Sequence, residues 1–361
     1  MDNYREVELL ARKTLGDSGT ETIDINVDEP ITEMTVRCYV KNDGAVADEV
    51  PPESIVSKIE IVDGGTVYYS VNGREASAVG WYDKLRWPAA WYSAMANEGS
   101  RVEWPLQFGR YLGDPEYALA PTRLLNPQVK FTWAKNALHL SGSVTLDVNA
   151  KTMQGVAPPS KMLATKVIRS WTTAAAGIEE VDLPTDYPFR RLYFRCYEKE
   201  QYLGNQWTNA RLECDVGKLI VFDMEDDELL NLMERIWGQV EYAEYVAADD
   251  GVMQQTHLGT CQSAAFTSMG LSIFVTGSPT LPGYVRMFAR NLDGVAQNDV
   301  KTNSTFRGLC PENTFCYPFG LPDDPATWFN APKYGSIKLK ITEADAGGAA
   351  SVLVQQPRPL P

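Results

Sequence analysis

Few residues in this chain have the type and spacing that catalysis requires. The chain contains only two histidines, His139 and His257, and a Ser-His-Asp or Cys-His triad would have to use one of them. His139 lies between two leucines beside an expected turn and strand, and His257 lies in a region rich in small and polar residues. Isolated histidines are more often structural or solvated than catalytic, so we favour that interpretation for both.

Two pairs of carboxylates could do acid–base chemistry. Asp114 with Glu116, and Asp323 with Asp324, could serve as the acid and base of a glycosidase or as calcium ligands. Each pair belongs to an Asp-Pro sequence close to a glycine, which is ordinary turn chemistry. Because both pairs lie at equivalent positions of a repeated motif, we interpret them as a repeated structural bend.

Metal and cofactor motifs are scarce in the sequence. The six cysteines contain no CxxC pair, and Cys310 with Cys316 has no partner histidine for a zinc site. We expect these two to be free thiols of a protein made in a reducing cytosol, with a disulfide as the alternative. Cys38 and Cys196 lie inside apolar strands, where a thiol acts as a small hydrophobe. There is no GxGxxG and no GxxxxGK[ST] sequence. The remaining two cysteines are Cys214 and Cys261. From the absence of these motifs we predict no catalytic residue, no cofactor and no metal ligand.

Acidic and aromatic clusters each have two interpretations. The acidic residues at 223 and 225–228 are best explained as a helix N-terminus, with a calcium site as the less favoured alternative. An aromatic stripe could stack on sugars, but such residues more often form core or anchor subunit contacts. Its members are Trp81, Tyr82, Trp87, Trp91 and Tyr92.

The composition and charge of the chain restrict the classes of function that it can have. The 361 residues are 44% hydrophobic and 22% charged, which are globular values, and they suffice for two domains. The net charge is −14 and no Lys/Arg-rich run occurs, which disfavours direct binding of nucleic acid. No apolar run follows residues 2–6, so we expect no secretory signal, and the longest apolar stretches are too short to span a bilayer.

The elements that would position these residues occur twice. The motif Phe-Gly-Arg-Tyr-Leu-Gly-Asp-Pro at 108–115 returns as Phe-Gly-Leu-Pro-Asp-Asp-Pro at 319–325, and an alternating strand follows each copy. Residues 34–39 likewise match residues 192–197, and the hairpin around Gly64-Gly65 matches the one around Val216-Gly217. Such self-similarity indicates one β-domain that has been duplicated and fused.

The pattern of each segment gives an expected organisation. We expect an amphipathic helix over residues 4–15 within an N-terminal helical arm (1–19), which packs on its own domain or reaches a neighbour or a membrane. A first β-domain then covers 20–157 and a second covers 158–361, with residues 150–177 as the connection. Residues 77–97 are expected to be partly helical and 226–237 to form a helix. The second domain carries about fifty extra residues at about 239–307, including an expected strand at 271–275.

The order of these elements resembles that of the double jelly-roll major capsid proteins of tailless icosahedral viruses, including bacteriophages with an internal membrane. Residues 105–114 and 124–129 carry the strongest likeness, which covers nearly the whole chain in element order. The resemblance implies an all-β fold of two tandem eight-stranded jelly-roll β-sandwiches with short helices. It also implies a structural protein without catalytic residues, located in the virion after synthesis in the host cytoplasm.

The same resemblance implies partners. Three copies would form a homotrimer, a pseudo-hexameric capsomer that tiles an icosahedral shell beside neighbouring capsomers. Minor capsid, penton or membrane proteins and an internal lipid membrane would be further partners, and the insertion would point outward. The N-terminal helix would lie on the inner side of the shell. Three alternatives stay open: a two-domain β-sandwich glycan-active hydrolase, a carbohydrate-binding or adhesion module, and a cellular cytosolic β-protein.

Overall fold

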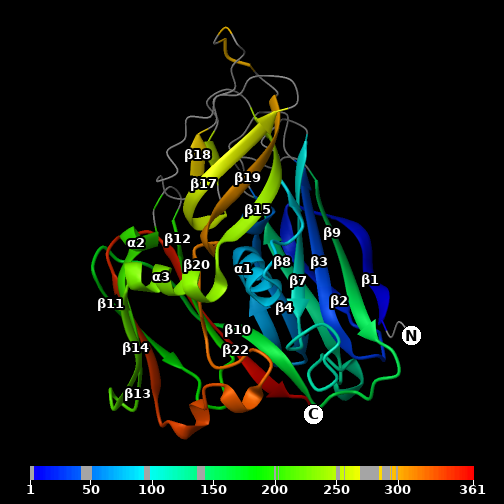
Figure 1. Cartoon of the computed structure of the whole chain (residues 1–361). Coiled ribbons are helices and arrows are strands. Elements are labelled where there is room, and N and C mark those ends of the chain that lie inside the picture. The colour runs from blue at the N-terminus through cyan, green and yellow to red at the C-terminus, as the bar shows by residue number, and fades with distance from the viewer. Residues whose placement is uncertain are drawn as a thin grey trace.

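The computed structural model describes residues 4–41, 51–92, 98–135, 143–198, 201, 203–248, 253–255, 257–268, 284–286, 293, 295–297 and 300–361. These residues are mostly in β-strands, which form two sandwiches side by side and a third group of strands that extends beyond them (Figure 1). The described chain begins at Tyr4 in the first sandwich, and the C-terminus lies near the boundary between the two sandwiches (Figure 1).

The first sandwich is built from the strands that precede residue 154. One layer has the strand order β1-β9-β3-β7-β6, and the facing layer has the order β2-β8-β4-β5. The first layer comprises β1 (Tyr4–Leu15), β9 (Val144–Met153), β3 (Ile31–Lys41), β7 (Gly99–Gln107) and β6 (Ala90–Trp91). The second comprises β2 (Ser18–Asp24), β8 (Pro127–Ala134), β4 (Val56–Asp63) and β5 (Thr66–Val71).

The second sandwich repeats this arrangement with later strands. Its layers have the orders β10-β22-β12-β20 and β11-β21-β13-β14. The first layer comprises β10 (Lys161–Thr172), β22 (Ala349–Pro359), β12 (Arg191–Tyr197) and β20 (Thr314–Pro318). The second comprises β11 (Gly177–Leu183), β21 (Ile337–Glu343), β13 (Trp207–Cys214) and β14 (Leu219–Glu225).

The two topologies correspond strand by strand. β1 to β5 are followed by a helix and then β7 to β9; β10 to β14 are followed by a helix and then β20 to β22. Each unit is thus a jelly roll of eight strands, to which the first unit adds the two-residue strand β6. The duplication predicted from the sequence is confirmed. The units join edge to edge, because β5 pairs in parallel with β10 at Ser70 and Lys166 and makes one continuous eight-stranded sheet.

The prediction of an N-terminal helix is wrong. Residues 4–15 form strand β1, which pairs antiparallel with β9 and is the counterpart of β10. Two register shifts, between Glu8 and Leu10 and between Leu10 and Lys13, interrupt the strand's alternation and produce a helix-like spacing of apolar residues. As the edge strand of its sheet, β1 leaves most of its side chains exposed, and charged residues there are typical of edge strands.

Capping residues mark the ends of the two longer helices, α1 and α3. α3 (Asp226–Trp237) has the bounds predicted from the sequence, whereas α1 (Gly73–Lys84) begins earlier and ends sooner than the expected 77–97. Asn72 and Glu75 make a reciprocal capping box at the start of α1, and Leu85, with φ of 51°, ends it. None of the helices in the described ranges is long and apolar enough to cross a membrane. The shorter helices are α2 (Leu203–Gln206), η1 (Pro52–Ser54), η2 (Pro121–Arg123), η3 (Pro325–Thr327) and η4 (Ala331–Lys333).

The segment between α3 and β20 forms the group of strands that extends beyond both sandwiches (Figure 1). It contains a three-stranded sheet of order β15-β19-β17 and a two-stranded sheet of β16 and β18. The expected strand at 271–275 lies outside the described residues. The strands are β15 (Val240–Ala248), β16 (Met253–Gln255), β17 (Leu258–Ser268), β18 (Tyr284–Arg286) and β19 (Val300–Pro311).

Apolar side chains fill both sandwiches. One continuous core includes the first jelly roll and reaches Tyr193, Leu353 and Phe306, so it extends into the second unit and the extra strands. A second core lies between the two layers of the second jelly roll. Burial of this contiguous apolar surface is the main stabilising term and couples the units into one body.

Candidate functional site: the junction between the two jelly rolls

Helix α1 lies at the junction of the two jelly rolls. Ten of its twelve residues are buried, although its sequence is only weakly apolar. Its side chains reach the second unit in two places: the Tyr82 hydroxyl donates to the carbonyl of Thr314 at 2.7 Å, and Glu75 accepts from the Ser351 hydroxyl at 2.5 Å. α1 therefore belongs to the first unit in sequence and to both units in packing.

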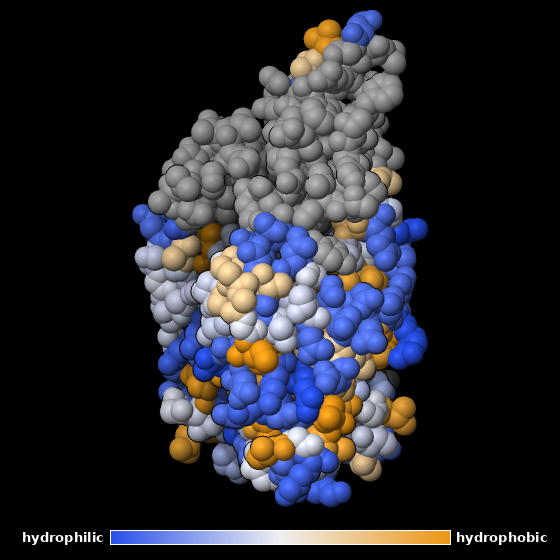
Figure 2. Space-filling model, turned by 90° about the vertical axis from the view of Figure 1, so that its left-hand side faces the viewer, coloured by the Kyte–Doolittle hydropathy of each residue, from blue (hydrophilic) through white to orange (hydrophobic). Residues whose placement is uncertain are grey.

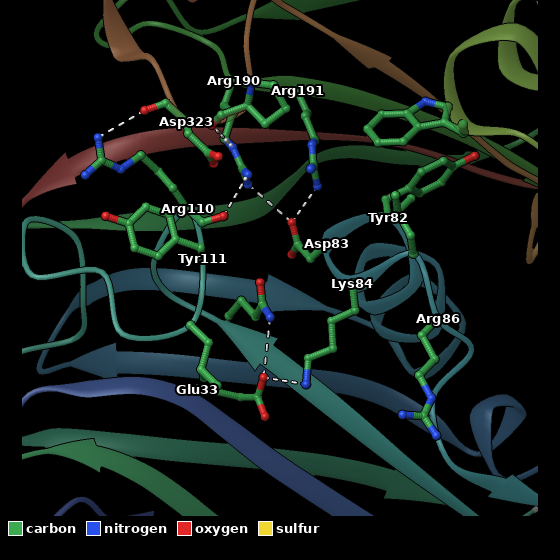
Figure 3. A pocket seen from close by; sticks show the side chains of 15 residues that line it. Glu33, Tyr82, Asp83, Lys84, Arg86, Arg110, Tyr111, Arg190, Arg191 and Asp323 are labelled. Atoms are coloured by element: carbon green, nitrogen blue, oxygen red, sulfur yellow. Dashed lines mark hydrogen bonds and ion pairs between the residues drawn. The ribbon is translucent and has the colours of Figure 1, made fainter. Parts of the chain in front are cut away.

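The C-terminal turn of α1 binds the second unit through Asp83 (Figure 3). Asp83 Oδ1 accepts hydrogen bonds from Arg191 Nη1 at 2.5 Å and from Arg190 Nη1 at 3.3 Å. Both arginines come from the start of β12 or the residue before it, so they approach the carboxylate side by side. Gln355 of β22 supports Arg190, accepting from its Nη1 at 2.8 Å.

The next residue of α1, Lys84, is positively charged and pairs with a carboxylate of the first unit. Lys84 Nζ lies 2.5 Å from Glu33 Oε2, to which Gln107 also donates at 3.4 Å. Figure 3 shows Asp83 directed toward the arginines and Lys84 toward Glu33. Neighbouring residues of opposite charge thus connect the helix end to both jelly rolls.

The repeat explains how this junction arises from a duplicated unit. Backbone pairing makes Thr32 equivalent to Arg190, because the amides of Phe108 and Phe319 donate to their respective carbonyls. Glu33 pairs with Gln107 as Arg191 pairs with Pro318, so these positions are equivalent too. The duplicated pair is therefore Thr-Glu in the first unit and Arg-Arg in the second. The side chains of these two arginines contact Asp83 of the first unit.

The charges at the junction are almost fully removed from water. The side chains of Asp83, Arg190 and Arg191 are 2%, 3% and 4% exposed. Burial and the nearby charge of Arg191 lower the pKa of Arg190. Removing one partner of such a buried group leaves an uncompensated charge, which is strongly destabilising. The arrangement therefore fixes the relative position of the two jelly rolls.

The two copies of the Phe-Gly motif meet at the same junction. Arg190 Nη2 donates to the carbonyl of Arg110 in the first loop at 3.2 Å, and its Nε donates to the carbonyl of Pro322 in the second loop at 3.0 Å. Arg110 Nη1 in turn donates to the carbonyl of Asp323 at 3.1 Å. A cavity of about 500 Å³ opens between these loops and the end of α1 (Figure 3).

The predicted carboxylates form turns at this place. Asp114 Oδ1 accepts from the amide of Glu116 at 3.0 Å, and Asp324 Oδ1 accepts from the amide of Ala326 at 3.1 Å, which is the same bend in both units. Asp114 also accepts from Arg110 Nε at 2.7 Å. Burial alone would raise the pKa of Asp114, but the hydrogen bonds from Arg110 outweigh it and the pKa lies below its ordinary value. The pair Asp114 and Glu116 shares the guanidinium of Arg110.

The glycines of the motif are required by close packing. A Cβ on Gly109 would lie 2.7 Å from the carbonyl oxygen of Tyr117, and one on Gly320 would lie 2.3 Å from that of Thr327. Gly320 also has φ of 69°, a conformation that side chains disfavour. The Phe-Gly sequence therefore marks the position where each loop returns against itself.

The other predicted residues lie elsewhere. His257 lies in a separate buried cluster with Glu53 and Glu312, and His139 is outside the described residues. All six cysteines are buried free thiols, as predicted for Cys310 and Cys316. The acidic run forms the N-terminus of α3, with Glu225 and Glu228 in a capping box, while Asp223 pairs with Arg211.

The aromatic stripe is divided by the fold. Trp81 and Tyr82 are buried on α1, and Tyr92 is buried beside Glu53. Trp87 stacks on Tyr242, with ring centroids 4.6 Å apart, and Trp91 is 44% exposed. The core interpretation therefore holds for most members of the stripe.

Sequence reasoning missed Asp83, Arg190 and Arg191, the residues that make the junction. The matched strands at 34–39 and 192–197 offered a signal, because extending the match by two residues aligns Thr32-Glu33 with Arg190-Arg191. A change of charge at equivalent positions of a repeat indicates that the two copies have different neighbours.

The whole chain was compared with known proteins. No protein-family model matches the sequence, and no curated protein matches it. Among solved structures, the major capsid protein of Sulfolobus turreted icosahedral virus is similar with a TM-score of 0.64 at 10% identity, covering 99% of this chain and 97% of that one.

Two further solved structures are similar to this chain over nearly its whole length. Vp54 of PBCV-1, fitted into a reconstruction of the virophage Sputnik, has a TM-score of 0.58 at 11% identity and covers 98% of this chain and 93% of its own. The major capsid protein P2 of bacteriophage PM2 has a TM-score of 0.56 at 10% identity, with 98% and 97% covered. The chain therefore has the fold of the double jelly-roll major capsid proteins.

Proposed function

We propose that this chain is a major capsid protein, whose two jelly rolls form one building block of a viral shell. The observation that carries the proposal is the extent of the likeness, which covers 99% of this chain and 97% of the major capsid protein of Sulfolobus turreted icosahedral virus. Both jelly rolls, their connection and their order are therefore shared. We place the division between them at 157/158 and the outward insertion at 239–307.

The junction supports this role physically. A shell subunit must hold its two jelly rolls at a constant angle, because each contact with a neighbour depends on that angle. The buried group of Asp83, Arg190 and Arg191 supplies that constraint, and the continuous sheet through β5 and β10 adds to it. The loop carbonyls of Arg110 and Pro322 bind the same guanidinium, so the ends of the jelly rolls are also held together.

Self-association follows from the shape of such a block. Two similar units in one chain, repeated around a three-fold axis, give six nearly equivalent edges, and closed symmetric association is the common outcome for soluble subunits. A homotrimer would then contact neighbouring capsomers through its outer faces. Its location would be the virion.

One such face is the outer sheet of the second jelly roll together with α3. Figure 2 shows this side, where apolar patches lie between hydrophilic ones. Large apolar side chains are exposed there on β11, on β14 and in the β13–β14 turn: Ile178 is 62% exposed, Ile220 46% and Val216 92%. Exposed apolar groups inside a polar surround are typical of surfaces that contact another protein.

Light scattering coupled to size-exclusion chromatography tests the proposal. A homotrimer has a mass of about 120 kDa, three times that of the 40.1 kDa chain. We expect this species over a wide range of protein concentration, since permanent assemblies bury large interfaces. A species of 40 kDa at every concentration would contradict the proposal.

A further inference from the structure

A cluster of three ionisable side chains is buried where three parts of the molecule meet. Glu53 comes from η1 of the first jelly roll, His257 from the residue before β17, and Glu312 from the turn between β19 and β20. One donor atom from each lies within 4.8 Å of the others. The three residues are 2%, 1% and 1% exposed.

We propose that Glu53, His257 and Glu312 bind a divalent transition-metal ion of the zinc class. Imidazole and carboxylate donors in a set of three are typical of zinc sites that keep one position for water. Calcium fits this set poorly, because it takes six to eight oxygen ligands. The inference does not depend on the proposed function.

The charge balance of the cluster favours a cation. Glu312 Oε2 binds Arg74 Nη1 at 2.7 Å, so one of the two carboxylates is compensated. The hydrogen bonds to Glu53 come from hydroxyl groups: its Oε1 accepts from the Tyr92 hydroxyl at 2.6 Å and from the Ser77 hydroxyl at 3.4 Å. Its Oε2 is buried and has no hydrogen-bond partner among the described residues. A buried carboxylate oxygen in that state is costly unless a proton or a cation binds it, and burial raises the pKa of Glu53.

The histidine is positioned as a ligand. Its Nδ1 lies 2.5 Å from Glu312 Oε1, and its backbone amide donates to the Tyr242 hydroxyl at 2.9 Å. The ring stacks on Tyr92, with centroids 4.4 Å apart. An ion with donors at about 2.0 Å holds them about 3.3 Å apart, so binding requires the Nδ1–Oε1 pair to open by less than about 1 Å.

The backbone that presents Glu312 has an unusual conformation. Glu312 and Asn313 both have positive φ, 49° and 56°, in the turn between β19 and β20. Gly, Asn and Asp adopt positive φ most readily, and Glu does so less often. Residues held in such conformations cluster at functional sites, and here the conformation directs the carboxylate to His257 and Arg74.

A bound ion would connect the first jelly roll, the extra strands and the second jelly roll at one point. To test this, the full-length protein is stripped with a chelator, incubated with Zn²⁺, desalted and analysed for metal. We expect one Zn²⁺ per chain, and we expect an excess of Ca²⁺ or Mg²⁺ not to displace it. Wild-type protein that retains no Zn²⁺ would overturn the proposal.

Variants locate the ion. E53Q and H257Q are expected to weaken Zn²⁺ binding at least tenfold, while far-UV circular dichroism checks that they fold. Two variants serve as matched controls: E241Q, at an exposed glutamate on β15, and H139Q, at the second of the chain's two histidines. Equal Zn²⁺ binding by E53Q and E241Q would overturn the proposal.

X-ray absorption of the wild-type zinc complex identifies the ligand atoms of the ion, and this measurement does not require the variants to fold. The expected spectrum has nitrogen and oxygen ligands, with the scattering of one imidazole. Sulfur ligands would show that a cysteine binds the ion and would overturn the assignment.

Discussion

Arg190 occupies in the second jelly roll the position that Thr32 occupies in the first, and the two side chains act in different directions. The Thr32 hydroxyl accepts from the amide of Gly113 within its own unit. Arg190 instead spans the junction, with hydrogen bonds to the carbonyls of Arg110 and Pro322 and an ion pair with Asp83. This divergent position of the repeat therefore adds a polar link between two units that already share an apolar core and a continuous sheet.

Removal of the Asp83 carboxylate should therefore destabilise the whole molecule. We expect D83A to lower the free energy of unfolding by about 3–5 kcal/mol, because it leaves two buried guanidinium groups without the carboxylate that balances their charge. Urea denaturation measures the effect. D182A is the control: the Asp182 side chain is 85% exposed and 3.8 Å from Lys338, so its removal should change stability by less than about 0.5 kcal/mol. Similar losses in both variants would contradict a special role for the junction.

The ion pair of Asp114 and Arg110 should make part of the stability depend on pH. The pKa of Asp114 is lowered in the folded state, so its contribution is fully present above the unfolded value of about 3.9. It is lost as the pH falls through the lower folded pKa. The stability difference between wild type and D114N should be constant from pH 7 to about 5 and shrink below about 4. Urea denaturation at several pH values measures it, and a difference that grows on acidification would contradict the assignment.

Close packing at the repeated Phe-Gly motif should make its second glycine hard to replace. Gly320 and Gly64 both have positive φ, 69° and 56°. A Cβ on Gly320 would lie 2.3 Å from the carbonyl oxygen of Thr327, whereas nothing lies within 4 Å of a Cβ on Gly64. G64A should cost about 1 kcal/mol and G320A at least about 1 kcal/mol more, since only the latter adds a clash. Thermal unfolding compares the two. An equal loss would show that the close approach is unimportant.

The buried thiols should be almost inert in the folded protein. Burial raises the pKa of Cys214 and Cys261 to about 11 and that of Cys196 to about 12, so little thiolate forms at pH 8. We expect Ellman's reagent to label none of the six cysteines rapidly in native buffer and all six in guanidinium chloride. A thiol that reacts natively at the rate of free cysteine would contradict this burial.

Much of the fold could be predicted from the sequence because the repeat carries long-range information. Matching strands at 34–39 and 192–197 placed β3 and β12 in equivalent positions, and the acidic first turn with its apolar face gave α3 its observed bounds. The N-terminal strand was mistaken for a helix because its bulges disturb the alternation on which strand prediction depends.

The sites were less predictable because their residues come together only through tertiary structure. Asp83 and Arg190 are 107 residues apart, and each lies in a segment whose local pattern indicates only a helix or a strand. Glu53, His257 and Glu312 are likewise scattered, and an isolated histidine gives no sign of its partners. The Asp-Pro bends were predictable as turns because Asx turns depend on neighbours two residues away.

Electron cryomicroscopy of the purified full-length chain shows whether its paired jelly rolls assemble around a three-fold axis. We expect particles with a three-fold axis and six jelly rolls around it, with the β15–β19 strands of each chain projecting from one face. Single chains, or assemblies in which the two jelly rolls of a chain adopt variable angles, would contradict it.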